Sequence, residues 1–410
     1  MNLRRAAAAD TGQFPFYMFL IYVIFYSGHA FYNTYTTLFL YENGLTQAQI
    51  GMVNAVFTTI LVFLKPLSGV LSDKSKNKAQ MIGLLLIANA AVCLAFYISA
   101  TALWLALCVV LYQLVFQPVY TMQESYTIEL MEKSRWDYGN IRLGGTLGYV
   151  AGAFIAGIVI GDDYGRIFWI MAIVYGVSGV LQLFARPIAG QRKQKEKVKY
   201  SVVFHHAPLM CLIGFQLLSS LGSSFGMYYS IYFRHTLGAP SELLSWMTVV
   251  AALSELPFFW YANRIERSIG TQNFMTIAVS ATVLKMMLLS FVTNPYVVLG
   301  LQVLGGMAVV GNGYSILKYI NDVVPKQMRT TAMMVNAIVV TIFSSVVCAP
   351  LVGVLDAQLG TQTVLIVGSA ISIGAVILFS AIFPVAVTHQ QKKEAMLKAA
   401  MGENVLPAEE

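Results

Sequence analysis

The charged residues of this chain are few, and several interrupt long apolar stretches. Six of them lie inside such stretches: Glu124, Glu255, Lys65, Arg142, Lys285 and Lys318. A carboxylate and a guanidinium on neighbouring segments can clamp a polar solute through charge-assisted hydrogen bonds, and a carboxylate that gains and loses a proton beside a lysine can act as a local switch. No nucleophile, base and orienting group can be assembled from these residues, so we expect no enzyme activity.

The elements that must position these residues are long apolar helices. Hydrophobic residues make up 57% of the 410 residues, charged residues only 11%, and the mean hydropathy is +0.68. In a soluble chain roughly a quarter of all residues are charged. Apolar stretches close to or above the ~20 residues that cross a bilayer recur along the whole length. They predict an all-α membrane protein with twelve spans: 14–41, 47–71, 79–98, 102–130, 139–161, 166–185, 207–233, 242–262, 272–291, 296–321, 330–355 and 363–384.

One polar stretch divides the spans into two sets of six. Residues 186–200, RPIAGQRKQKEKVKY, form the only long charged segment between spans. We therefore expect an N-terminal six-helix bundle at 1–185, a cytoplasmic central loop at 186–206, a C-terminal six-helix bundle at 207–390 and a cytoplasmic tail at 391–410. The first apolar run is about 28 residues long and lacks a cleavage signature, so we expect it to be retained as a helix.

Lysine and arginine are distributed unequally between the two sides of the predicted bundle. Of the 26, twenty fall in the termini and loops of one side, and only Arg166 and Arg234 fall in the loops of the other. Positively charged loops stay on the cytoplasmic side of a membrane. Both termini are thus predicted to be cytoplasmic, in a multi-pass protein of the bacterial inner membrane. The net charge of +7 follows from this bias, so we expect contact with the lipid bilayer and no nucleic-acid partner.

No pattern in the sequence indicates a metal or a cofactor. The four cysteines lie in apolar spans without CxxC spacing, and the five histidines are scattered over different spans and loops, whereas metal centres need clustered ligands. The phosphate-binding pattern GxxxxGK[ST] is also missing from the sequence. We therefore expect a proton gradient, in place of ATP, as the energy source.

Polar side chains recur on one face of three spans. Spacings of three and four residues place them on a single helical face, and such stripes are expensive against lipid tails. Three of them favour one wet central cavity, with hydrogen bonds between helices as the alternative for any single stripe. Lys318 is expected to pair with Asp322, four residues later, along its own helix. The stripes are Tyr22, Tyr26, His29 and Asn33; Gln113, Gln117, Tyr120 and Glu124; and Asn312, Ser315, Tyr319 and Asp322.

The predicted span 139–161 carries glycines four residues apart, at Gly144, Gly148 and Gly152. Small residues at this spacing let two helix backbones approach closely. The stripe suits helices that rock against each other in a transporter, and it suits a static helix contact equally well.

The segment GVLSDKSKNK resembles a signature of the major facilitator superfamily. It joins the second and third spans, and Gly69, Asp73, Lys74 and Lys78 match the pattern G-x-x-x-D-[KR]-x-x-x-[KR]. The Gly-Arg pair usual inside this loop is replaced by Lys-Asn. The resemblance implies a cytoplasmic loop whose contacts favour one conformational state. Asp73 is expected to cap an adjacent helix start, where backbone N–H groups are unpaired.

Longer stretches are similar to the lactose permease branch of this superfamily and to its nucleoside and phenylpropionic acid permease relatives. KPLSGVLSDK is similar to the second helix and its loop, DYGNIRLGGTLGY to the fifth helix, SELPFFWYANRI to the eighth, and LKYI to the end of the tenth. The similarity covers most of the chain. It implies the major facilitator fold, with two pseudo-symmetric six-helix bundles and alternating access.

This resemblance implies roles for several residues. The lactose permease pairs a carboxylate on helix four with an arginine eighteen residues later, and Glu124 and Arg142 have that spacing. Tyr149 stands in place of its tryptophan platform. Glu255 matches the carboxylate of helix eight, and Lys285 stands where the relatives carry arginine on helix nine. A pair of Glu255 and Lys285 is the implied protonatable switch.

Other positions depart from the lactose permease. Its tenth helix carries a lysine, a histidine and a glutamate as a proton relay, where this chain has Gln302, Gly305 and Ala308. An asparagine that binds the sugar on helix eight is replaced by Phe258. Lactose itself is therefore not the expected substrate.

The sequence as a whole predicts a monomeric, proton-coupled symporter that takes up a small polar organic solute such as a sugar, a glycoside or a nucleoside. An aromatic-acid symporter of the phenylpropionate type and a non-transporting solute sensor are the alternatives. Proton coupling is assigned to Glu255, Lys285 and Glu124. Substrate binding is assigned to Glu124, Arg142, Tyr149, His29, Asn33, Gln117, Glu255 and Asn312.

Overall fold

The computed structural model describes residues 14–131, 134–136, 138–161, 163–189, 207–324 and 329–400, and all regular elements in these ranges are helices. The first half of the chain forms one helix for each predicted span. These helices are α1 (Phe16–Glu42), α2 (Gln47–Lys74), α3 (Lys78–Ala95), α4 (Ala102–Met131), α5 (Tyr138–Val159) and α6 (Arg166–Leu183).

The second half also forms six spans, but two of them change helix type partway. The seventh span runs through α7 (Ala207–Ser223), the 3₁₀ segment η2 (Ser224–Tyr228), α8 (Tyr229–Ile231) and the π-helical η3 (Tyr232–Thr236). The eleventh runs through α12 (Arg329–Ile342), the π-helical η5 (Phe343–Cys348) and α13 (Ala349–Leu359). The other four spans are α9 (Ser241–Ile269), α10 (Thr271–Phe291), α11 (Pro295–Val323) and α14 (Thr361–Ala400).

The lengths and compositions of these helices suit a membrane. Within the described residues, nine helical segments are long and apolar enough to cross a bilayer, and α2 and α7 contribute shorter apolar stretches. Helix α1 has the length, 27 residues, but also carries tyrosines and other polar side chains. Together these helices account for the twelve predicted spans. The prediction of an all-α membrane protein built from twelve spans is confirmed.

The last helix is longer than predicted. It continues to Ala400, past the predicted end of the span at 384 and past the predicted start of the tail at 391. The added residues are rich in Gln, Lys and Ala, which favour helix formation without being strongly apolar as a group. Hydropathy predicts only the part of a helix that lies in the lipid. The end of the helix itself also depends on helix propensity, so the predicted span ended too early.

The connection between α2 and α3 differs from the expected loop. Helix α2 continues through Asp73 to Lys74, so only three residues connect the two helices. The cap of α3 is Asn77, whose side chain accepts hydrogen bonds from two backbone N–H groups in the first turn. Asn77 caps α3 because it directly precedes the helix. The side chain of Asp73 and the surroundings of Gly69 lie outside the described part of the chain, so the expected capping by Asp73 stays a prediction.

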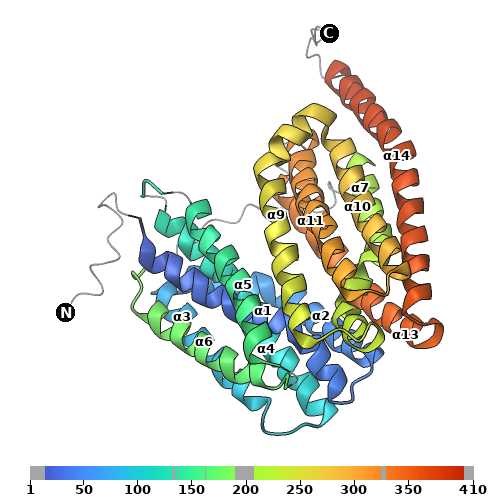
Figure 1. Cartoon of the computed structure of the whole chain (residues 1–410). Helices are drawn as coiled ribbons and strands as arrows, with labels where there is room; N and C mark the ends of the chain where they lie inside the picture. Colours follow the sequence, from blue (N-terminus) through green and yellow to red (C-terminus); the bar gives the residue numbers. More distant parts are fainter. Residues whose placement is uncertain are drawn as a thin grey trace.

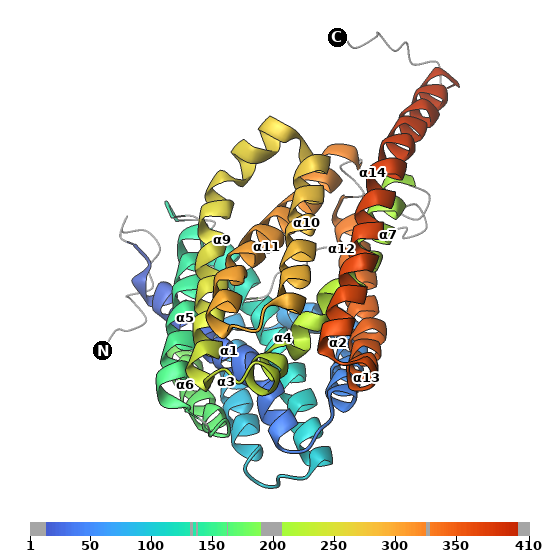
Figure 2. The same ribbon diagram turned by 45° about the vertical axis from the view of Figure 1, so that its right-hand side comes forward.

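The two halves of the chain lie side by side, with α1–α6 in blue to green and α7–α14 in yellow-green to red (Figure 1). In the first half α1 packs along α5 and α3 along α6; in the second, α11 packs against α9 and α10, and α7 packs against α14. The halves contact each other mainly through α5 with α9 and through α2 with α13. Figure 2 shows α2 and α13 together at the end of the molecule opposite to the free end of α14.

Candidate functional site

A cavity of about 310 Å³ lies between the two halves. Helices α1 and α5 line it from the first half, and α8, α9, α10 and α11 line it from the second. Its polar lining residues are Asn33, Thr34, Thr37, Tyr149, Tyr229, Ser230, Thr248, Glu255, Lys285 and Gln302, and the remaining lining residues are apolar. A concave cavity in which polar groups converge beside apolar side chains can bind a small polar molecule.

Contacts between the halves close one end of this cavity. The hydroxyl of Thr34 lies 3.2 Å from that of Thr248, and the hydroxyl of Tyr35 lies 2.7 Å from that of Ser245. Gly157 of α5 also meets α9 here, because a Cβ at Gly157 would lie 2.8 Å from the Cβ of Ser245. These contacts involve the C-terminal part of α1 and the N-terminal part of α9, so the cavity is closed on that side.

The wall of the cavity that belongs to the first half includes Asn33 and Tyr149, and Asn33 also contacts His29. Asn33 Nδ2 lies 3.0 Å from His29 Nε2 and donates a hydrogen bond of 3.4 Å to the Tyr149 hydroxyl. The His29 ring stacks on Phe116, with centroids 4.6 Å apart. His29 and Asn33 are four residues apart on α1, which places them on one helical face. The structure thus brings three of the predicted substrate-binding residues together.

Glu124 and Arg142 lie near this wall without forming a direct ion pair with each other. The guanidinium carbon of Arg142 lies 4.3 Å from the ring centroid of Tyr26, and Glu124 Oε1 accepts a hydrogen bond of 3.3 Å from the Tyr138 hydroxyl. The two charges are close enough to interact electrostatically. A cation over an aromatic face keeps donor groups for a further partner. Their predicted use as a solute clamp stays a prediction.

Lys285, Gln302 and Tyr229 form the opposite wall. Lys285 Nζ donates a hydrogen bond of 2.8 Å to Gln302 Oε1 and lies 5.8 Å from the ring centroid of Tyr229. Gln302 Nε2 in turn donates a hydrogen bond of 3.2 Å to the Tyr229 hydroxyl. The amide of a nearly buried glutamine therefore holds the ammonium group at the cavity.

Glu255 and Lys285 line the same cavity, but within the described part of the chain no direct ion pair joins them. The partner of Lys285 is Gln302, because the side chain of Gln302 reaches it from the adjacent helix α11. Sequence reasoning missed this pair. The one feature of the sequence that pointed to this contact is the position of Gln302, which corresponds to a proton-relay residue of the lactose permease.

Like His29, Glu124 and Arg142, two further predicted ligands are not among the described residues that line the cavity. Gln117 donates a hydrogen bond of 3.4 Å to Gln113 along its own helix α4. Asn312 stands ten residues beyond Gln302 on α11, which is roughly 15 Å along a helix. Neither residue is among the described residues that line the cavity. Their roles in binding stay predictions.

The polar stripe of α11 packs partly into the second half instead of facing the cavity. Ser315 is fully buried, and the ring of Tyr319 packs on Phe383 of α14 with centroids 4.9 Å apart. Lys318 Nζ lies 2.9 Å from Asp322 Oδ2, which confirms the predicted pair along the helix.

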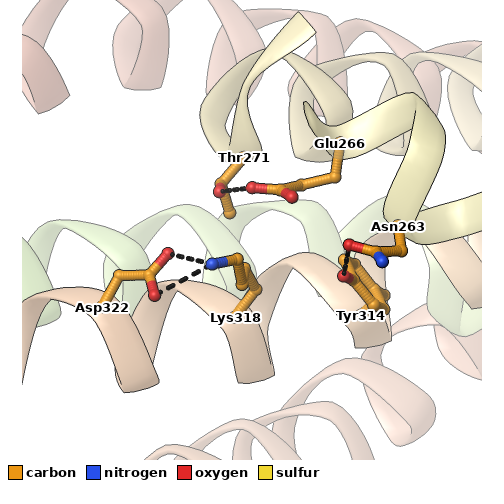
Figure 3. A network of polar contacts seen from close by, with 6 residues as sticks. All are labelled: Asn263, Glu266, Thr271, Tyr314, Lys318 and Asp322. Carbon is orange, nitrogen blue, oxygen red and sulfur yellow. Dashed lines mark hydrogen bonds and ion pairs between the residues drawn. The ribbon is translucent and has the colours of Figure 1, made fainter. Parts of the chain in front are cut away.

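Figure 3 shows this pair within a network of polar contacts at the ends of α9 and α11 and the start of α10. The Thr271 hydroxyl donates a hydrogen bond of 2.7 Å to Glu266, and the Tyr314 hydroxyl donates one of 3.4 Å to Asn263. These contacts hold the ends of the helices of the second half together, away from the cavity.

A buried ion pair joins the start of α3 to α4. Lys78 Nζ lies 2.6 Å from Glu129 Oε1, and the Lys78 side chain is only 1% exposed. The sequence placed Lys78 in a cytoplasmic loop with exposed lysines. The short connection between α2 and α3 instead makes Lys78 the first residue of a packed helix, and Lys74 remains exposed at the end of α2.

The comparisons with known proteins agree with this architecture. A family model described as "MFS_1 like family" matches residues 16–341. The lactose permease of Klebsiella oxytoca is 22% identical over 382 residues, which cover 86% of this chain and 90% of that permease. The sucrose permease of Escherichia coli is 22% identical over 368 residues, which cover 84% of this chain and 87% of that permease.

Among solved structures, the nucleoside transporter NupG superposes with a TM-score of 0.78 at 16% identity, covering 93% of this chain and 99% of NupG. This likeness shows the fold. The family model covers most of the chain, and the relatives are membrane transporters and not enzymes, as the sequence predicted. The chain therefore belongs to the MFS_1 like family of the major facilitator superfamily, and it is a multi-pass membrane transporter.

Proposed function

We propose that this transporter takes up a small polar organic solute, a sugar, glycoside or nucleoside, together with a proton. The observation that carries the proposal is the cavity between the halves, which hydroxyl, amide and charged side chains surround from both sides. Such groups bind solutes rich in hydroxyl and ring nitrogen or oxygen atoms. Tyr149 and Tyr229 add aromatic rings, on which a sugar ring or a base can stack.

The relatives support the same class of solute. Two of them are a lactose permease and a sucrose permease, and one of the solved structures with a similar fold is a nucleoside transporter. Each of these solutes is a polar ring compound of moderate size. The mixed lining of the cavity suits this class better than an apolar solute.

A solute in this cavity would contact both halves at once. Asn33 and Tyr149 belong to the first half, whereas Glu255 and Lys285 belong to the second. A ligand shifts a conformational equilibrium only when it binds the states with different affinity. Groups that move apart when the halves rock supply that difference, so binding at this position would drive alternating access.

Glu255 is the proposed proton carrier. It lines the cavity, and its side chain makes no direct hydrogen bond or ion pair with another described residue. It lies within electrostatic range of Arg142. Protonation of Glu255 would remove a negative charge from between the two halves, and a local change of charge of this kind can bias a two-state element.

The test is solute-dependent proton movement in de-energised cells that express the protein. Sugars, glycosides and nucleosides are added in turn while the external pH is recorded. We expect alkalinisation with one solute class and its loss in Glu255→Gln, whereas Glu242→Gln, an exposed carboxylate at the start of α9, should behave as the wild type.

Uptake of radiolabelled solute is measured in the same cells. Uptake without alkalinisation would leave the solute class standing and overturn the proton coupling. Neither uptake nor alkalinisation across the panel, with the protein present in the membrane, would overturn the proposed function as a whole.

We also propose that both termini face the cytoplasm of a bacterial cell and that the transporter works as a monomer. The excess of lysine and arginine on the side of the termini supports the orientation. Labelling of a cysteine introduced at Lys74 or at Glu242, with a reagent that does not cross membranes, tests the orientation, because the two positions lie at opposite ends of the bundle.

A further inference from the structure

The ammonium group of Lys285 stands at the cavity with a neutral partner. A lysine carries three N–H donors, and Lys285 uses one of them on Gln302 Oε1 at 2.8 Å. Its other neighbour is the ring face of Tyr229. No carboxylate forms an ion pair with Lys285 in the described part of the chain. A cation inside a membrane protein normally has an anionic partner or lines a solute pathway.

The orientation of the Gln302 amide is determined by its own partners. Its Nε2 group donates to the backbone carbonyl of Val298 at 3.3 Å and to the Tyr229 hydroxyl at 3.2 Å. A carbonyl oxygen only accepts and an ammonium only donates. The amide oxygen must therefore face Lys285, and Gln302 holds the cation without neutralising it.

Gly305 leaves the space that the ammonium group occupies. It stands one turn beyond Gln302 on α11, and a Cβ at this position would lie 3.3 Å from Lys285 Nζ. A side chain there would press on the ammonium group. Gln302 and Gly305 thus form a neutral seat for a cation at the cavity.

We propose that Lys285 binds a carboxylate of the solute, so that this transporter prefers the acid forms of polar ring compounds, such as uronic acids or nucleoside carboxylates. The inference rests on the proposed function and names the substrate class of the same cavity. A single ammonium beside a glutamate suits a monoanion better than a doubly charged phosphate.

Glu255 bears on this proposal because it lines the same cavity. The charged or titratable groups that interact with Glu255 or share its cavity are Arg142 and Tyr149 from α5, Lys285 from α10 and Tyr229 from α8. An ionised Glu255 would repel the incoming carboxylate. A protonated Glu255 would not, so the acid and the proton would bind together, and this links the substrate class to the proposed coupling.

Two matched pairs of solutes test the proposal. Methyl glucoside is compared with methyl glucuronoside, and uridine with uridine 5′-carboxylic acid, so that each pair differs in one carboxylate. Binding to the purified full-length protein is measured by calorimetry, and uptake is measured in proteoliposomes. A charge-assisted hydrogen bond changes affinity by about tenfold or more. We expect the acid of at least one pair to bind about tenfold more tightly than its neutral partner.

Variants of Lys285 and its neighbours distinguish the contribution of charge to acid binding from that of packing. Gln302→Glu places a carboxylate on Lys285 at nearly unchanged volume and should lower the ratio of acid affinity to neutral affinity to about one, because the introduced carboxylate takes the place of the solute's carboxylate on the ammonium group. Lys285→Gln should do the same. Glu255→Gln should strengthen binding of the acid, because it removes the repulsive charge. Thermal unfolding of each variant shows whether it is folded.

The outcomes distinguish failure of the acid preference from failure of the proposed function. If neutral solutes bind and are transported while their acids bind equally or more weakly, the preference for acids is wrong and the proposed function stands. An acid preference that survives in folded Gln302→Glu and Lys285→Gln would also overturn the role of Lys285. If no member of either pair binds or is transported, the proposed function fails with it.

Discussion

At the scale of single residues, the charged side chains at and near the cavity are held mainly by neutral neighbours. Arg142 stacks on Tyr26, Glu124 accepts a hydrogen bond from a tyrosine, and Lys285 rests on an amide. Charges held in this way keep hydrogen-bonding capacity for a ligand. The buried pair of Lys78 and Glu129 is different, because its two charges pair directly with each other away from the cavity.

Asn33 is a direct test of the cavity wall. Its side chain joins His29 to Tyr149 and faces the cavity. In Asn33→Ala we expect a solute affinity lower by about threefold to tenfold, because a hydrogen bond contributes about 0.5–1.5 kcal/mol. The measurement is the concentration dependence of uptake. Asn273→Ala, at the exposed start of α10, should leave it unchanged, and an equal effect of both variants would contradict this role.

Lys78 should contribute to stability and not to solute binding. Removing one member of a buried ion pair leaves the other charge unpaired, which costs about 3–5 kcal/mol. We expect Lys78→Gln to lower the midpoint of thermal unfolding in detergent clearly. Lys318→Gln breaks an exposed pair and should change the midpoint little, since exposed pairs are screened by solvent. Similar midpoints for the two variants would show that burial does not determine how strongly the loss of an ion pair lowers the unfolding midpoint.

At the scale of elements, the glycine stripe of α5 is a contact with α1. The three glycines each meet the residue 125 positions earlier in the chain, so the two helices run parallel and keep one register. Gly144 meets Phe19, Gly148 meets the backbone of Val23 and Gly152 meets Ser27. The sequence left open whether this stripe served packing or movement. Within this structure it is a close backbone contact inside one half.

Gly148 is the most sensitive position of this stripe. A Cβ there would overlap the backbone carbonyl of Val23, which cannot move aside as a side chain can. We expect Gly148→Ala to lower the midpoint of thermal unfolding, by an overpacking cost of about 1–3 kcal/mol. Gly176→Ala, in the middle of α6 with no atom within 4 Å of the added Cβ, should keep or raise the midpoint, because alanine favours helix over glycine. A lower unfolding midpoint for Gly176→Ala than for Gly148→Ala would contradict the packing role of Gly148.

At the scale of the whole molecule, the halves meet at the end opposite to the free end of α14. Helices α2 and α13 approach closely there, since a Cβ at Gly51 would lie 2.9 Å from the Cα of Pro350. The contact of Tyr35 with Ser245 closes the same end. The cavity is therefore closed toward the side that we propose to be external.

A bulky residue at Gly51 should separate the halves at this end. We expect Gly51→Trp to expose Ser245, which is 2% exposed in this structure. The measurement is labelling of Ser245→Cys, in a background without the four native cysteines, by an impermeant maleimide added from outside. Gly300→Trp, at an exposed position with no atom within 4 Å of its added Cβ, is the control. Equal labelling of both would mean that the close contact at Gly51 does not hold this end shut.

The sequence predicted the spans well, and the misses have clear causes. Span positions followed from hydropathy, because each span must present about 20 apolar residues to lipid. The changes of helix type at η2, η3 and η5 were not predicted. Segments of 3₁₀ and π helix use backbone angles close to those of an α-helix, so their positions depend on the helices that pack against them.

The number, order and approximate length of the spans can be obtained from the amino-acid sequence alone, because the bilayer imposes the same apolar requirement on each helix separately. The partners of the charged residues cannot. Whether Lys285 meets Glu255 or Gln302 depends on how α9, α10 and α11 are placed against each other, and on side chains that extend several ångströms from their helices. That choice, and with it the chemistry of the cavity, is made by tertiary structure.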